Sequence, residues 1–305
     1  MTRPFEVSFV CAVAVTLGAF LGRGAVAADE APVVAPDVSS HGLAHEPVDE
    51  PAPSAEPRPS AVPSSASFAR PSLPMKDGMV RIPGGRYTMG IGDSRAPLNE
   101  RAGKSSTVAP FWMDRTEVSA GSYRRCVDEG HCEAPQRTST TCTYDLGDPE
   151  LPVSCVRWDD ADRYCRAAAK RLPREIEWEF AARGVTGLRY PWPGAAPDCS
   201  RAVTLQSEAT GTSCTSVGHP TRVGSHPGGA SLYGVQDLSG NVEEWTTDWY
   251  VERAGQGPAP RAGASHVLRG GGWLSLPSMS RTTSRNWGSA VEAGPNVGFR
   301  CARDE

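Results

Sequence analysis

Cysteine thiols are the most reactive side chains in this 305-residue sequence, and there are nine of them. Cys11 lies in an apolar N-terminal run, and the other eight lie between residues 126 and 301. None forms a C-x-x-C pair, and a zinc site generally needs such a pair or two histidines at short spacing. An even number of cysteines is typical of the disulfide framework of an exported protein, with free thiols as the alternative. Proximity along the chain favours three pairs and leaves a fourth as the remainder: Cys126–Cys132, Cys142–Cys155, Cys199–Cys214 and Cys165–Cys301.

The other potential catalytic groups do not form a recognisable set. Ser275 and Ser280 carry hydroxyls, but they lie in no G-x-S-x-G elbow and no base can be assigned to them. His219 and His226 are seven residues apart in an expected loop, where histidines are more often surface residues than metal ligands. H-E-x-x-H and P-loop patterns are absent from the sequence. Catalysis is therefore not the favoured function.

Three helices and several short strands are expected to position these residues. Ser119 can cap a helix over 119–129, and Asp159 can cap a second helix that begins there. A third helix is expected over 174–183, because a glycine follows it directly. Strand-like runs such as 79–82 are punctuated by glycine turns, and long loops fill much of the rest.

The N-terminal residues have the composition of an export signal and a linker. Residues 1–27 contain Arg3, an apolar run and an A-x-A site, which is typical of a cleaved signal peptide, with a retained anchor as the alternative. Residues 28–74 hold ten prolines, nine alanines and eight serines, so they are expected to form a disordered linker. The whole chain carries a net charge of −4, and the part after the linker is neutral. This balance argues against a nucleic-acid partner.

Six phrases of the sequence are distinctive. They are MVRIPGGRYTMG (79–90), PFWMDRTEV (110–118), LPVSCVRWDDADRYCRAAAKRLPREIEWEFAARG (151–184), GVQDLSGNVEEW (234–245), RGGGW (269–273) and GFRCARD (298–304). Taken in order, these phrases resemble the formylglycine-generating enzyme family, also called the sulfatase-modifying factor domain. The resemblance covers residues 79–305 and implies an α+β fold of the C-type-lectin-like kind, rich in loops and stapled by disulfides. It also implies the Cys165–Cys301 bridge.

The resemblance fails at the family's catalytic positions. Active members use two cysteine thiolates to hold copper while they oxidise a cysteine of a sulfatase, and these cysteines align with Ser275 and Ser280. Copper(I) is soft and selects thiolates, so a hydroxyl is a poor replacement. Gly272 replaces a usual serine and Glu243 a usual aromatic residue. Copper binding is therefore not expected.

Calcium is the metal that the resemblance favours. By the family pattern its ligands would be the carboxylates of Asp237 and Glu244 with the carbonyls of Gly240 and Val242. Such hard oxygen ligands suit calcium. The alternative is that the two carboxylates only accept hydrogen bonds from turn amides.

A binding groove is a weaker expectation of the resemblance. Trp287, Arg281 and Arg285 lie in the part of the chain that borders the substrate groove in active members, where Trp287 could contact a peptide or glycan. Core packing is the alternative for Trp287, and a structural role for the two arginines. Five tryptophans in motif positions are expected in the core: Trp112, Trp158, Trp178, Trp245 and Trp273.

Two functions follow as alternatives. The first is an exported, non-catalytic binding or structural module, periplasmic or extracellular, with a protein, peptide or glycan partner. The second is a copper-dependent oxidoreductase that converts a protein cysteine to formylglycine. We favour the first because serines replace the copper-binding cysteines. We further expect a monomer without a transmembrane span once the signal is removed.

Overall fold

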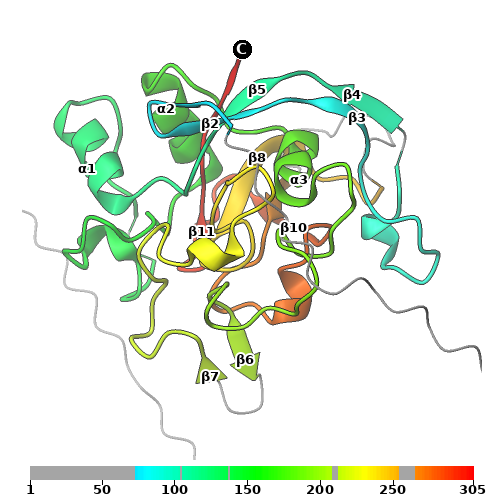
Figure 1. The fold of residues 1–305 in the computed structure, drawn as a ribbon. Helices are drawn as coiled ribbons and strands as arrows, with labels where there is room; N and C mark the ends of the chain where they lie inside the picture. Colours follow the sequence, from blue (N-terminus) through cyan, green and yellow to red (C-terminus); the bar gives the residue numbers. More distant parts are fainter. Residues whose placement is uncertain (1–72, 104, 137, 208–211, 254–264) are drawn as a thin grey trace, which may run out of the picture. The chain divides into compact units, whose positions relative to one another are not determined.

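Two four-stranded sheets and three α-helices carry most of the regular structure in the computed structural model of the chain, counted over the described residues (Figure 1). The structure describes residues 73–305 apart from 104, 137, 208–211 and 254–264. The first sheet is antiparallel and has the order β1 (Met75–Lys76), β2 (Met79–Ile82), β5 (Phe111–Asp114), β12 (Ala302–Asp304). The second has the order β10 (Arg285–Ser289), β9 (Ser265–Arg269), β8 (Glu243–Trp249), β11 (Val297–Gly298), with β11 parallel to β8. Two small hairpins complete the strands: β3 (Gly85–Thr88) with β4 (Ser105–Val108), and β6 (Leu205–Ser207) with β7 (Thr212–Ser213).

The register of the first sheet follows from the alternation of its side chains. Val80 pairs with Met113 and Ile82 with Phe111, and all four side chains are buried on one face. Successive residues of a strand point to opposite faces, so the residues between them turn outward. The predicted strand over 79–82 is confirmed.

The described part of the chain contains three α-helices. Helix α1 (Ala120–Asp128) begins as predicted, since the Ser119 hydroxyl accepts a hydrogen bond from the Ser122 amide. Helix α3 (Glu175–Arg183) ends at Gly184, which has a φ of 58°.

The predicted start of the second helix was wrong. Helix α2 (Trp158–Ala167) begins at Trp158, and Asp159 lies in its first turn. The reason is a tertiary contact, because the Trp158 indole donates to the Thr246 carbonyl and its ring stacks on His266. These contacts hold Trp158 in helical conformation.

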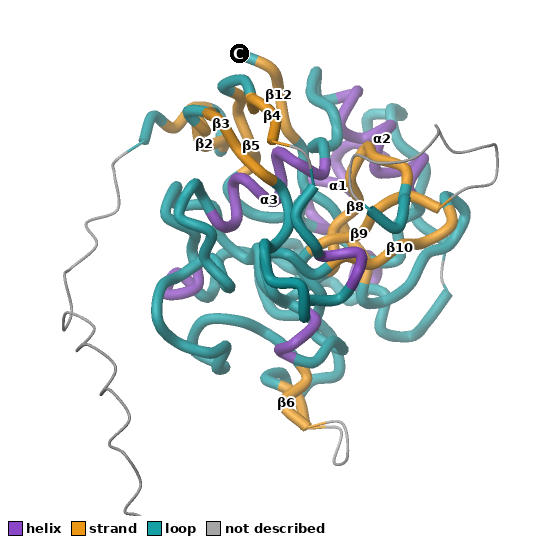
Figure 2. The backbone as a smooth tube through the Cα atoms, turned by 90° about the vertical axis from the view of Figure 1, so that its right-hand side faces the viewer, coloured by secondary structure: helices purple, strands orange, loops and turns teal. Residues whose placement is uncertain are grey.

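Helix α3 packs into the core of the first sheet and also reaches the second sheet. It contacts β4 of the small hairpin and both β8 and β9 of the second sheet. Trp178 and Phe180 of this helix are buried with Val80 and Met113 of the first sheet. A second cluster joins α1 and α2 to β8 and β9. The backbone between these elements is largely loop (Figure 2).

All four predicted disulfides are present in the structure, which is a loop-rich α+β fold as expected. Cys165–Cys301 joins α2 to the residue before β12 across 136 positions. In the chain-entropy account such a long closed loop stabilises the native state by about 4–5 kcal/mol. The other three bridges close loops of 6, 13 and 15 positions.

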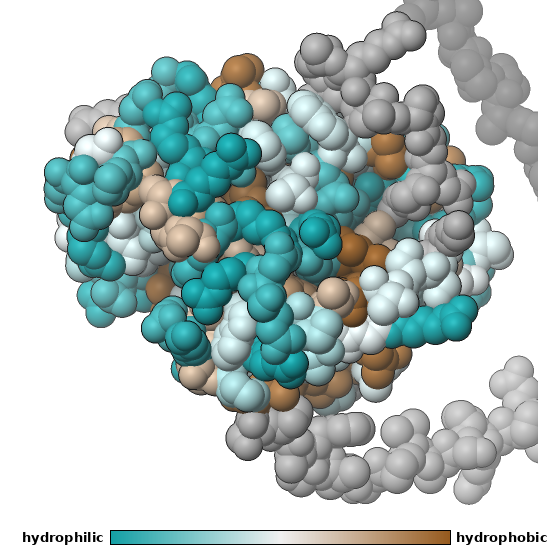
Figure 3. Space-filling view, turned by 90° about the horizontal axis from the view of Figure 1, so that it is seen from above, coloured by the Kyte–Doolittle hydropathy of each residue, from teal (hydrophilic) through white to brown (hydrophobic). Residues whose placement is uncertain are grey.

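The export signal predicted for residues 1–27 lies outside the described residues, and so does nearly all of the linker predicted for 28–74. Among the described residues, no helix has both the length and the apolar character needed to cross a membrane. Seen from above, the described surface is mostly hydrophilic, with smaller apolar patches between polar residues (Figure 3).

Candidate functional site

The loop after β9 carries Ser275 and Ser280, the two serines that the resemblance aligned with catalytic cysteines. Ser275 is buried, and its hydroxyl oxygen accepts hydrogen bonds from the Gly272 amide at 3.0 Å and from the Asn296 side chain at 3.3 Å. Ser280 is also buried, and its hydroxyl donates to the Pro277 carbonyl at 3.0 Å. Among the described residues neither hydroxyl has a histidine or carboxylate partner. Both hydroxyls are therefore engaged in hydrogen bonds that hold the loop.

Asn296 explains the unusual glycine at position 272. A Cβ atom at this position would lie 2.3 Å from the Asn296 side-chain oxygen. That oxygen accepts a hydrogen bond from the Leu274 amide at 3.0 Å, so it is held in place. The Asn296 amide group thus occupies the space that a serine at 272 would need, and it ties residues 272–275 together.

This contact predicts a coupled pair of substitutions. Gly272→Ser should lower the free energy of unfolding by about 1–3 kcal/mol, because the new side chain overlaps Asn296. When Asn296→Ala is already present, Gly272→Ser should lower the free energy of unfolding by less. The difference between the two losses should be at least about 1 kcal/mol. Urea unfolding of the parent, the two single variants and the double variant measures both the loss and the difference between the two losses.

A matched control is Gly294→Ser, because Gly294 lies two residues before Asn296 and a Cβ at this position meets nothing within 4 Å. The control should stay within about 0.5 kcal/mol of the parent protein. Equal costs of Gly272→Ser in the two backgrounds would show that Asn296 does not set the glycine requirement.

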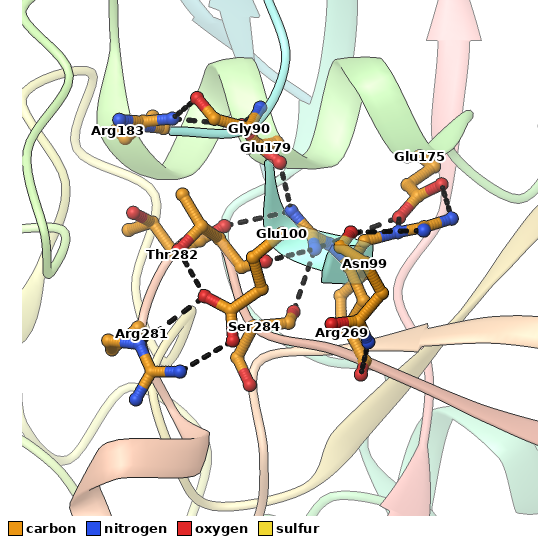
Figure 4. Close-up of polar contacts among 12 residues, drawn as sticks. Gly90, Asn99, Glu100, Glu175, Glu179, Arg183, Arg269, Arg281, Thr282 and Ser284 are labelled. Carbon is orange, nitrogen blue, oxygen red and sulfur yellow. Dashed lines mark hydrogen bonds and ion pairs between the residues drawn. The ribbon is translucent and has the colours of Figure 1, made fainter. Parts of the chain in front are cut away.

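A buried ion-pair network fixes the loop against α3 (Figure 4). Arg269 of β9 is fully buried and pairs with Glu179 of α3. Its guanidinium also donates to the carbonyls of Thr282 and Ser284 at 2.8 and 2.7 Å. One oxygen of Glu179 accepts from the Tyr87 hydroxyl and the Gly90 amide, at 2.8 and 2.7 Å. One arginine therefore positions the loop 282–284 relative to a helix and a hairpin.

Arg281 and Arg285, the two arginines expected at a groove, each pair with a carboxylate of the chain. Arg285 is buried and forms a two-point ion pair with Glu175, at 2.5 and 2.9 Å. Arg281 pairs with Glu100 at 2.5 Å, and its side chain is 18% exposed. Both guanidiniums are held by carboxylates of the chain itself, so they are structural cations.

Trp287 lies on the surface of β10. It is 50% exposed, which excludes the core position, and its ring packs at 4.4 Å against Tyr250. None of the described pockets is lined by it. Of the five tryptophans expected in the core, Trp178, Trp245 and Trp273 are buried, and the other two are half-buried.

The residues expected to hold calcium lie near the buried guanidinium of Arg300. Glu244 is fully buried, and both of its oxygens accept from Arg300 at 2.6 Å. The Trp178 indole donates a further hydrogen bond to it at 2.8 Å. Asp237 has a φ of 59°, and its carboxylate accepts from the Gly224 amide at 2.6 Å. Glu244 is therefore already paired with a cation, whereas within the described part of the chain Asp237 forms no ion pair.

Glu117 is a third carboxylate at this place, and the sequence reasoning missed it. One of its oxygens accepts from the Asn241 side chain at 3.0 Å, and the other is buried without a partner. Burial raises its pKa well above the usual range, and the Asp237 carboxylate adds to this effect. The signal in the sequence was the second of the two acidic residues in the phrase PFWMDRTEV. In the described part of the chain, no three His, Cys, Asp or Glu side chains are arranged to hold a metal ion by themselves.

Glu243 has an unusual environment for a carboxyl group. It is buried on β8, where the family usually has an aromatic residue, and the Asn286 side chain donates to it at 3.1 Å. Burial raises its pKa to about 7, and the hydrogen bond from Asn286 opposes this only in part. No arginine, lysine or histidine forms an ion pair with it among the described residues.

Comparison with known proteins shows the family of the chain. The formylglycine-generating enzyme of Streptomyces coelicolor is 30% identical over 304 residues, which covers 80% of this chain and 96% of that protein. A mouse protein named inactive C-alpha-formylglycine-generating enzyme 2 is 31% identical over 271 residues, covering 73% and 85%. The structure of PvdO from Pseudomonas aeruginosa superimposes with a TM-score of 0.60 at 26% identity, covering 74% and 94%. The family described as the sulfatase-modifying factor enzyme 1-like domain matches residues 64–305, and the chain belongs to this family.

Proposed function

We propose that the chain is an exported, non-catalytic member of its family that serves as a binding or structural module. The observation that carries this proposal is the state of the two catalytic positions. Ser275 and Ser280 are buried and hydrogen-bonded within their own loop. All eight cysteines between residues 126 and 301 are in disulfides, so no free thiolate is available there for copper(I). The name of the mouse relative indicates that the family contains inactive members.

Export is supported by two independent features. The first is the signal-peptide pattern of residues 1–27. The second is the set of four disulfides, which form and persist in oxidising compartments. Mass spectrometry of the protein from a cell-envelope or culture fraction tests this, because cleavage after the A-x-A site gives a new N-terminus at Ala28. Recovery of the intact chain in the cytosolic fraction with reduced cysteines would contradict export.

An oxidation assay tests the absence of catalysis. The purified full-length chain is loaded with copper(I) and given a C-x-P-x-R peptide in air, and the mass of the peptide is followed. We expect no conversion under conditions in which the Streptomyces coelicolor enzyme converts the same peptide. Conversion of the peptide would establish the alternative function, a copper-dependent oxidoreductase that forms formylglycine, which the family membership favours.

We also propose a structural calcium ion beside Asp237. The buried oxygen of Glu117 that lacks a partner supports a cation here, since a buried unpaired carboxylate is costly. Asp237 and Glu117 would supply carboxylate oxygens, and Gly240 and Val242 would supply carbonyls. Glu244, which Arg300 already holds, would contribute mainly negative charge. The role of the ion would be to neutralise these buried acids.

Removal of calcium should therefore lower the melting temperature. With free calcium about 100-fold above its Kd, we expect a melting temperature about 5–10 °C higher than in EDTA. Asp237→Asn should abolish this difference, and asparagine tolerates the positive φ of that position. Asp77→Asn is the matched control, because Asp77 also has a positive φ and lies in an exposed turn. Equal melting temperatures of the parent protein in calcium and in EDTA would refute the site.

A further inference from the structure

A surface pocket of about 430 Å³ lies beside the loop of Ser275 and Ser280. It is lined by residues 188–190, 192 and 194–196. The loop touches its wall twice, since the Tyr190 hydroxyl donates to the Pro277 carbonyl at 3.3 Å and the Thr282 amide donates to the Arg189 carbonyl at 2.9 Å. The pocket is thus fixed to the part of the fold that holds the family's catalytic positions.

The floor of the pocket is rigid and aromatic. The rings of Tyr190 and Trp192 stack with centroids 5.7 Å apart, and the two residues are 8% and 5% exposed. Their polar atoms are already used, because the Trp192 indole donates to the Ala195 carbonyl. With so little ring surface exposed, they do not form the open aromatic platform on which a sugar ring stacks.

Arg189 is the charged group of the pocket. Its side chain is exposed and lies over the Tyr190 ring, with the guanidinium carbon 5.9 Å from the ring centroid. Within the described part of the chain it forms no ion pair, whereas Arg269, Arg281 and Arg285 are each paired with a carboxylate. No acidic residue lines the pocket. The charge that complements this pocket is therefore negative.

The loop beside the pocket adds an apolar contact surface. Met279 is 49% exposed and lies in the same 3₁₀ turn, Pro277–Met279, whose first carbonyl binds Tyr190. A methionine side chain is flexible and apolar, and it adapts to the aliphatic side chains of a partner. The pocket thus has an unpaired arginine in its lining, and the loop that touches its wall carries an exposed methionine. Together they suit a peptide with an acidic and an apolar residue.

We propose that this pocket binds an extended peptide segment that places a carboxylate on Arg189 and an apolar side chain beside Met279. The proposal rests on the binding-module function and names the class of its partner. A carboxylate can accept two parallel hydrogen bonds from a guanidinium. This geometry fixes the orientation of the carboxylate in addition to the attraction between the charges. The small side chains at 194–196 leave room for a peptide backbone above the aromatic floor.

The test uses two probe peptides on the full-length protein. These are Ac-Ala-Leu-Asp-Leu-Ala-NH₂ and the same peptide with asparagine in place of aspartate. The protein carries ¹⁵N-labelled tryptophan, and the Trp192 indole signal is assigned by its loss in Trp192→Phe. We expect the aspartate peptide to shift this signal in a saturable manner and the asparagine peptide to bind about tenfold more weakly. Arg189→Gln should weaken the aspartate peptide to the same level, and added salt should do so in part.

Arg86→Gln is the control, because Arg86 is also exposed but lies on β3, outside the pocket lining. It should leave binding unchanged. Equal binding of the two peptides, or an unchanged affinity in Arg189→Gln, would overturn the proposal. So would a shift of the Trp287 signal without one of Trp192, or tighter Arg189-dependent binding of glucuronic acid than of the aspartate peptide. None of these results depends on the oxidation assay, so the two proposals fail separately.

Discussion

Replacement of Arg269 by methionine should lower the free energy of unfolding by about 3–5 kcal/mol, enough to unfold much of the protein at 37 °C. Arg269 is fully buried and pairs with Glu179, which is also fully buried. Its loss leaves the buried Glu179 carboxylate with Arg183, at 3.1 Å, as its one remaining cationic partner among the described residues. It also removes the donors to the carbonyls of residues 282–284. Urea or thermal unfolding followed by circular dichroism measures the effect.

A second substitution separates the charge from the packing. Glu179→Gln in the Arg269→Met background removes the unpaired charge but keeps a carbonyl that accepts from Tyr87 and Gly90. We expect it to recover part of the loss, about 1–2 kcal/mol, even though Glu179→Gln alone destabilises the parent protein. If Glu179→Gln costs the same in both backgrounds, the ion pair is not what makes Arg269 important.

Features of the fold that depend on nearby residues could be predicted from the sequence. The three closest disulfides and the ends of α1 and α3 follow from residues at most 15 positions apart. The start of α2 could not be predicted in this way. It depends on contacts of Trp158 with Thr246 and His266, about a hundred residues later.

The contacts at the candidate site depend on distant residues in the same way. Arg285 pairs with Glu175, which lies 110 positions earlier, and no local pattern reveals that pairing. The importance of Glu117 likewise depends on Asp237 and Arg300, which only the fold brings near it. Motif phrases identified the family, but they did not show which charged residues neutralise each other inside the protein.

Glu243 should make the protein less stable as the pH rises from about 4.5 to about 7. Its pKa in the folded state is about 7, against 4.5 for an ordinary glutamate, so the folded state binds the extra proton between these values. Below pH 4.5 the carboxyl is neutral in both states and costs nothing. Above pH 7 it is ionised in both states, and burial of the charge costs about 3 kcal/mol at 1.36 kcal/mol for each pH unit.

Glu243→Gln should therefore stabilise the protein in a pH-dependent way. Glutamine has nearly the same shape, and its carbonyl can still accept the hydrogen bond from Asn286. We expect the variant and the parent to have equal free energies of unfolding near pH 4.5, and the variant to be about 3 kcal/mol more stable at pH 8. Urea unfolding at both pH values measures the difference, and other titrating groups cancel because both proteins contain them. A difference that stays constant with pH would mean that Glu243 keeps an ordinary pKa and that its charge is solvated in the folded state.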